Sequence, residues 1–149
     1  MAGGVVRRRR GRADERGAAA VEFALVVPLL LVILFGIISY GYMLSFRQAI
    51  SQAAAEGARA AAVTLAGTSD VQRSALARTA VEEALDSYGV DCTGAMTCTI
   101  NAADTCGSAT CVSVELDYNW GDEPLVPALP GLGLVTPDHL VYRAVAQVS

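Results

Sequence analysis

Glu22 is the residue whose type and position most need a chemical explanation. It stands at the start of an uncharged, apolar run over residues 23–46. An ionisable group within a membrane helix costs up to about 3 kcal/mol at the centre and less near the edge. Taken alone, Glu22 is explained by a place at headgroup depth, where the positive end of a helix favours a carboxylate by about 0.3–1 kcal/mol. Its position therefore predicts a compensating dipole or charge.

Four cysteines form the second group with chemical potential: Cys92, Cys98, Cys106 and Cys111. Their spacing, C-x5-C-x7-C-x4-C, contains no C-x2-C unit and fits a zinc site poorly. Outside the cytoplasm, two disulfides would stabilise a small domain whose core alone is marginal. Local pairs, Cys92 with Cys98 and Cys106 with Cys111, and nested pairs both fit the spacing, so the connectivity stays open.

The residue types offer little support for catalysis. His139, the single histidine, follows Asp138 in a proline-rich segment that precedes an expected strand. This position indicates a histidine on a surface loop, and nothing in the sequence supports a Ser-His-Asp triad built on it. No glycine-rich phosphate loop follows a strand, and Glu82 with Glu83 is a pair on a helix surface. We therefore expect no enzyme activity, no catalytic residue, no cofactor and no bound metal.

Length and composition limit the class of protein. A chain of 149 residues has room for one small folded unit, or for a membrane helix with a modest domain, and is too short for a large multidomain enzyme. Hydrophobic residues make up 53%, charged residues 17%, and the mean hydropathy is +0.41. These values exclude intrinsic disorder and exceed the apolar content of a typical small soluble domain.

The apolar run that begins beside Glu22 is long enough to cross a membrane. Residues 23–46 would form a helix of about 36 Å, and a hydrocarbon core is roughly 30 Å thick. Apolar side chains surround its circumference, which disfavours a soluble core helix. The run is also longer than the about 7–15 apolar residues of a secretory signal, although Ala53-Ala54-Ala55 follows it. Pro28 removes one helix hydrogen bond and predicts a mild kink.

Charge is divided unevenly on the two sides of this run. Residues 1–17 hold six arginines and two acids, whereas the rest of the chain holds five arginines and thirteen acids. The positive-inside rule places the N-terminus in the cytoplasm and the chain beyond about Arg47 outside, with Tyr40, Tyr42 and Phe46 as an interfacial belt. Nucleic-acid binding by the basic tail is disfavoured, because such tails are not normally followed at once by a membrane span.

The residues around Glu22 resemble a known processing site. Residues 16–31 read RGAAAVEFALVVPLLL, a basic leader ending in Arg16-Gly17, then a short spacer, Glu22-Phe23 and the apolar run. This order is similar to the type IV prepilin processing site. More narrowly, residues 16–63 resemble TadE-like proteins, which are minor pilins or pseudopilins of the tight-adherence (Tad, or Flp) pilus system.

The resemblance implies that a prepilin peptidase in the membrane cuts after Gly17 and exposes an ammonium on Ala18. In a filament of parallel helices, the Glu22 carboxylate of one subunit would neutralise that ammonium on its neighbour, and a helix at the wrong height would leave both charges unpaired. Gly17 suits the scissile position because, without Cβ, it lets a protease approach the backbone closely. Phe23, where major pilins of such systems typically have tyrosine, and the long following body indicate a minor component.

Beyond the membrane, the sequence predicts two helices. The first continues over 47–66 and ends at Gly67. It carries a small-residue stripe for close packing on its own domain or on another subunit: Ile50, Ala54, Gly57, Ala61 and Leu65. Ser69 and Gln72 predict a capping box for a second helix over about 70–87, which Gly89 closes.

Three strands follow from the alternation of apolar and polar residues. Residues 112–120 alternate strictly and predict a half-buried strand, with 97–100 as its hairpin partner and 140–148 as a third strand. The prolines and glycines between the last two strands indicate an extended loop: Pro124, Pro127, Pro130, Gly131, Gly133 and Pro137.

The expected molecule is therefore α+β and pilin-like, with a leader over 1–17, a transmembrane helix over 18–46 and an extracytoplasmic domain over 47–149. It would be a single-pass membrane protein that assembles into an adhesive Tad pilus outside the cell. Its implied partners are the membrane, the prepilin peptidase, other Tad pilins and the inner-membrane assembly platform, and no nucleic acid. One alternative is an uncleaved anchor that displays a small binding or adhesion domain. A second is a secreted hydrolase released by signal peptidase.

Overall fold

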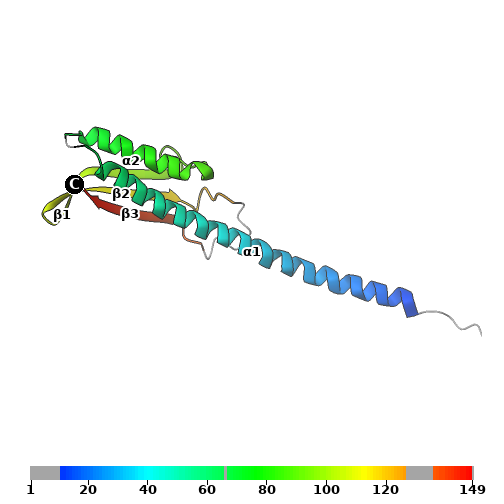
Figure 1. The fold of residues 1–149 in the computed structure, drawn as a ribbon. Coiled ribbons are helices and arrows are strands. Elements are labelled where there is room, and N and C mark those ends of the chain that lie inside the picture. The colour runs from blue at the N-terminus through cyan, green and yellow to red at the C-terminus, as the bar shows by residue number, and fades with distance from the viewer. Residues whose placement is uncertain (1–10, 66, 127–135, 149) are drawn as a thin grey trace, which may run out of the picture. The chain divides into compact units, whose positions relative to one another are not determined.

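A computed structural model describes residues 11–65, 67–126 and 136–148, with side chains from residue 17 onward. The elements in chain order are α1 (Gly11–Ala62), α2 (Asp70–Leu85), the 3-10 helix η1 (Asp86–Tyr88), β1 (Met96–Cys106), β2 (Ala109–Asn119) and β3 (His139–Gln147) (Figure 1). The chain divides after Ile38 into an N-terminal unit and a compact domain over Ser39–Ser149. The predicted α+β class is confirmed.

The sheet of the domain is antiparallel with the strand order β1-β2-β3. In its centre, Leu116 of β2 pairs with Cys98 on one side and with Tyr142 on the other. All three predicted strands are present, but β1 has 11 residues where the sequence predicted four. A register irregularity between Asn101 and Asp104 interrupts the alternation of β1, which explains why its second half was missed.

The core of the domain lies between the inner face of the sheet and the two helices. The predicted inner face of β2 is confirmed, since Val112, Val114, Leu116 and Tyr118 are buried at 2% exposure or less. Ser113, predicted on the outer side, is also buried, at 6% exposure. Helix α2 and the second half of α1 add further buried residues to this hydrophobic core: Phe46, Ile50, Ala54, Ala58, Ala77, Val81 and Leu85. Side chains from both helices and from all three strands therefore form one continuous core.

Gly57 marks the closest approach of the two helices. A Cβ at this position would lie 2.7 Å from Val81 Cγ2 and 3.1 Å from the Ala77 carbonyl oxygen, both in α2. Ile50, Ala54 and Ala61 of the same predicted stripe are buried with it. The stripe thus packs within its own domain, which is one of the two predicted uses.

The turn between the helices differs from the prediction. Helix α1 ends at Ala62 and does not continue to Gly67, which lies in the turn with φ 87°. Just beyond the helix end, the Thr64 hydroxyl donates to the Ala61 carbonyl (3.1 Å) and accepts from Arg73 Nε of α2 (3.1 Å). Leu65, predicted to lie on the packed stripe, follows the end of the helix and is 86% exposed.

The predicted helix caps are present. The Ser69 hydroxyl accepts from the Gln72 amide and the Gln72 side chain accepts from the Ser69 amide, which completes the capping box of α2. After α2, the chain continues as η1, which ends at Gly89, where the left-handed backbone (φ 66°) suits glycine. In the proline-rich loop, Pro124 and Pro137 lie outside helices and strands, whereas Pro127, Pro130, Gly131 and Gly133 lie outside the described residues.

Phe46 was wrongly predicted as part of an interfacial belt. It is fully buried in the domain, with its ring centroid 4.8 Å from that of Tyr118 and 5.8 Å from that of Trp120. Tyr42 is partly buried beside Tyr88. The apolar run over residues 23–46 thus contains exposed side chains that suit a membrane and, at its end, the first residues of the domain core.

Candidate functional site

The candidate processing site lies in the first described turns of α1. The backbone is helical through Gly17 and Ala18. Among the described residues, no side chain and no backbone outside the helix comes within 4 Å of the place a Gly17 Cβ would take. Ala18 and Glu22 are four residues apart and therefore share one face of the helix. This geometry brings together the predicted cut and the predicted carboxylate.

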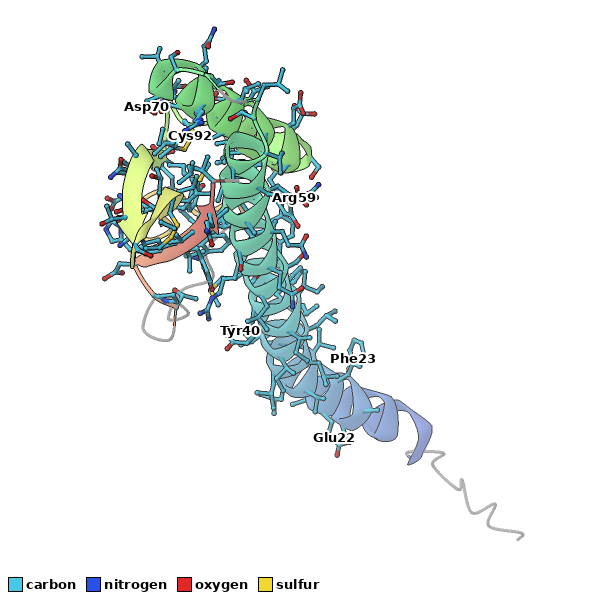
Figure 2. All side chains as sticks on the ribbon, turned by 60° about the vertical axis from the view of Figure 1, so that its left-hand side comes forward. Glu22, Phe23, Tyr40, Arg59, Asp70 and Cys92 are labelled. Carbon is cyan, nitrogen blue, oxygen red and sulfur yellow. A yellow bond between two sulfur atoms is a disulfide. The ribbon has the colours of Figure 1, made fainter. Side chains whose placement is uncertain are left out.

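Glu22 has an exposed side chain in this unit, and Figure 2 shows it projecting away from the helix. The described residues one turn away on its face, Ala18 and Val26, offer no cation. Among the described side chains, none forms a hydrogen bond or an ion pair with Glu22. Its carboxylate is therefore placed to interact with a group outside this part of the chain.

Apolar side chains surround α1 beyond Glu22. Seven consecutive residues, close to two turns, are each 45–62% exposed: Leu29, Leu30, Leu31, Val32, Ile33, Leu34 and Phe35. The stretch Gly17–Ala62 contains a window long and apolar enough to cross a membrane, with a mean hydropathy of 2.8. Pro28 lies inside α1 without ending it, and its effect on the helix direction stays a prediction.

Most of the apolar surface of α1 ends where the domain core begins, although Leu44 is still 40% exposed. Met43 is 1% exposed and Phe46 is fully buried. Arg47, the first charged residue after Glu22, donates from Nε to the Tyr142 hydroxyl (3.0 Å). The exposed apolar part is thus close to residues 23–42, which at about 1.5 Å per residue corresponds to about 30 Å of helix, the thickness of a hydrocarbon core.

The four cysteines form two local disulfides, one of the arrangements left open by their spacing. Cys92 pairs with Cys98, which links the segment after η1 to β1, and the two Cα atoms are 5.4 Å apart. Cys106 pairs with Cys111 and closes the β1–β2 hairpin, with a Cα–Cα distance of 5.9 Å. The label of Cys92 marks the first bridge in Figure 2. Disulfides persist in oxidising compartments, so the pairing suits a domain outside the cytoplasm.

His139 lies on the surface as predicted, but in a strand and not in a loop. It is the first residue of β3, and its Nδ1 is 2.8 Å from Asp117 Oδ1 on β2. Its hydrogen bond to Asp117 and the charge of that carboxylate raise the pKa of His139, and Asp138 and Asp122 act in the same direction. Within the described residues, no group of three or more His, Cys, Asp or Glu side chains is placed to hold a metal ion.

The fold and the site together define a class: an α+β protein with one long apolar N-terminal helix that could cross a membrane, followed by a small disulfide-bonded domain. Residues 17–59 match the family model of TadE-like proteins. The match begins at Gly17 and includes Glu22, Phe23 and Pro28. It confirms the resemblance over this segment and suggests a protein related to the Tad pilus. Comparisons with curated proteins and with solved structures give no match.

Sequence reasoning missed one surface feature of the domain. Val141 and Val145 on β3 are each 52% exposed, on the sheet face opposite the core. The signal was present, because the odd positions of residues 139–147 read His, Val, Arg, Val and Gln. These two valines lie on a strand that ends the sheet in the part of the chain described, so they flank an edge open to a further strand.

Proposed function

We propose that this chain is a minor pilin or pseudopilin of a Tad-type adhesive pilus, cut after Gly17 by a prepilin peptidase and assembled through Glu22. The observation that carries the proposal is the exposed Glu22 carboxylate. It has no partner among the described side chains, shares a helix face with Ala18 and stands at the start of an apolar surface. The match to TadE-like proteins over residues 17–59 supports it.

Cleavage supplies the cation that Glu22 lacks. Hydrolysis of the Gly17–Ala18 bond leaves an ammonium on Ala18 at the N-terminal end of an apolar helix. Either charge alone is costly where water is scarce, whereas an ammonium and a carboxylate in contact compensate one another. Because the two groups lie at fixed heights on α1, pairing them between neighbouring chains would set the register of the helices.

In this reaction the chain is the substrate and not the enzyme. The scissile bond lies in helical backbone, so the peptidase must open the first turns of α1 to reach it. Glycine eases that opening, because it is about 1 kcal/mol less favourable than alanine in a helix. The missing Cβ also leaves the backbone accessible.

The proposed topology has the arginine-rich leader in the cytoplasm and the disulfide-bonded domain outside. The charge asymmetry of the sequence and the two disulfides both favour this direction. Before assembly, the apolar surface of α1 would be covered by lipid. In the pilus, the same surface would be covered by other Tad pilins, delivered through the inner-membrane assembly platform.

Two substitutions separate processing from assembly. Gly17→Val should leave uncut precursor in the membrane, as immunoblots of membrane fractions would show. Glu22→Ala should be cut and anchored but absent from sheared pilus fractions. Glu56→Ala is the matched control, because Glu56 is an exposed carboxylate of the same helix that pairs only with Arg59 three residues away. Normal incorporation of the Glu22→Ala protein would refute the pairing.

A further inference from the structure

The outer edge of β3 has backbone groups that no described strand uses. The Val148 amide donates to the Thr110 carbonyl of β2 (3.0 Å). Backbone groups of an antiparallel strand alternate in direction, so the even-numbered residues of β3 face β2 and the odd-numbered residues face the other way. Val141, Arg143 and Val145 therefore direct their N–H and C=O groups away from the sheet, which ends at β3 in the part of the chain described.

In the part of the chain that the structure describes, this edge has neither a proline nor a bulge, two features that prevent strand addition. β3 contains no proline, and its register with β2 is continuous over nine pairs from Cys111–Gln147 to Asn119–His139. Proteins commonly protect edges with proline, bulges or charged side chains. The opposite edge has such protection, since β1 carries a register irregularity at Asn101–Asp104.

The two basic side chains of β3 contact carboxylates on the other strands. Arg143 Nη2 reaches across β2 to Asp104 Oδ2 (2.8 Å), and His139 Nδ1 lies 2.8 Å from Asp117 Oδ1. The Ser113 hydroxyl, the Thr105 amide and Arg143 hold the pKa of Asp104 below its usual value, so that carboxylate is charged at neutral pH. Both basic side chains therefore already have an acidic partner, and neither presents an isolated charge to an approaching strand.

The exposed side chains of the edge indicate what would fit it. Val141 and Val145 lie two residues on either side of Arg143, whose side chain is 55% exposed. A guanidinium has five N–H donors, and a single contact with Asp104 leaves capacity for a second carboxylate. β3 itself carries no acid, whereas β1 has Asp104 and β2 has Glu115 and Asp117. The complement is thus a carboxylate flanked by β-branched residues.

We propose that the outer edge of β3 binds an extended segment of a partner protein as a fourth strand of the sheet, with a carboxylate opposite Arg143 and β-branched residues opposite Val141 and Val145. Main-chain hydrogen bonds would supply most of the affinity and these three side chains the specificity. This interaction surface is separate from the cleavage and pairing site of α1.

A second copy of the chain fits the edge less well. In the domain, β3 and the second half of α1 run in the same direction (Figure 1). Antiparallel pairing of two β3 strands would place these two α1 segments in opposite directions, which suits two chains anchored in one membrane poorly. It would also place Arg143 opposite Arg143, without a carboxylate between them.

Amide hydrogen exchange of the full chain in detergent micelles tests the proposal. The probe is a synthetic heptapeptide, Thr-Val-Thr-Glu-Thr-Val-Thr with blocked ends, and a control peptide has lysine in place of glutamate. The glutamate peptide should protect the amides of Val141, Arg143 and Val145, whereas the even-numbered amides are already protected. The lysine peptide should bind about two- to thirtyfold more weakly. Arg143→Glu should reverse this preference.

Two variants distinguish strand addition from non-specific peptide binding. Val145→Pro removes an outward N–H but no bond to β2, and it should weaken binding at least about tenfold. If this variant does not fold, Val145→Lys replaces it, with Val71→Lys as a control at an 80% exposed valine of α2. Absence of protection at millimolar peptide, or unchanged binding by the β3 variants, overturns the proposal. Odd-numbered amides that are protected without peptide and lose protection on dilution overturn it in favour of a second copy.

Discussion

Phe46→Ala should unfold the domain at a markedly lower temperature although Phe46 belongs to the uncharged apolar run. Its side chain is fully buried, with ring centroids 4.8 Å from Tyr118, 5.1 Å from Tyr88 and 5.8 Å from Trp120. Truncation of a buried phenylalanine to alanine costs about 3–5 kcal/mol. For a domain of this size, about 4 °C of Tm is lost per kcal/mol, so a decrease of more than about 12 °C is expected.

Trp120 provides the assay. It is the only tryptophan of the chain, it is 4% exposed, and it packs against Phe46, so its fluorescence reports directly on this core. Thermal unfolding would be followed in detergent with the disulfides intact. The control is Phe35→Ala, at a side chain that is 48% exposed on the N-terminal unit, which should change Tm by no more than about 2 °C. Equal shifts for the two variants would refute the assignment of Phe46 to the core.

Three further predictions concern the domain. Gly57→Leu should destabilise it by at least about 1–3 kcal/mol in thermal unfolding, because even a Cβ would lie 2.7 Å from Val81 Cγ2; an unchanged Tm would contradict this. Ser69→Ala should lower the free energy of unfolding by about 1 kcal/mol, because the capping box of α2 is lost. An unchanged free energy of unfolding would show that the cap does not stabilise the domain. The NMR pKa of His139 should exceed about 6.5, and Asp117→Asn should lower it. The stabilisation from this pair is complete below about pH 6.5 and is lost as pH rises through the raised pKa, so pH-independent stability would argue against it.

Local rules predicted those parts of the fold whose causes are local. The capping box needs only Ser69 and Gln72, and Gly89 ends η1 because its backbone is left-handed. The alternation along β2 predicted its inner face, although the opposite face is also buried at Ser113. In each case the determining residues are close in the sequence.

Features that depend on distant contacts could not be predicted in the same way. Phe46 resembles the neighbouring lipid-facing residues in composition, and only the positions of Tyr118 and Trp120 distinguish it from them. The stripe on α1 was extended to Leu65 because its periodicity continues, whereas the Thr64–Arg73 hydrogen bond belongs to the tertiary structure. The disulfide pairing likewise depended on the strand register, which brings Cys106 near Cys111.

The candidate site was predicted almost entirely from sequence, because its residues lie on one helix. The register of Gly17, Glu22, Phe23 and Pro28 with the apolar run carries the resemblance, and residues 17–59 match TadE-like proteins. The structure adds the accessibility of Gly17, the exposed carboxylate of Glu22 and the start of the core at Met43. Cleavage and assembly stay predictions.

The mass of the intact mature protein, purified from membranes or pili of its native cell, tests the central claim most directly. If a prepilin peptidase removes the leader, the mass will equal that of a chain starting at Ala18 with two disulfides. A chain that retains Met1 or begins at Ala2 would identify an uncleaved anchor. One that starts beyond Phe46 would identify a product of signal peptidase. Either result would contradict the proposed cut after Gly17 and, with it, the pairing of Glu22 with a new N-terminus.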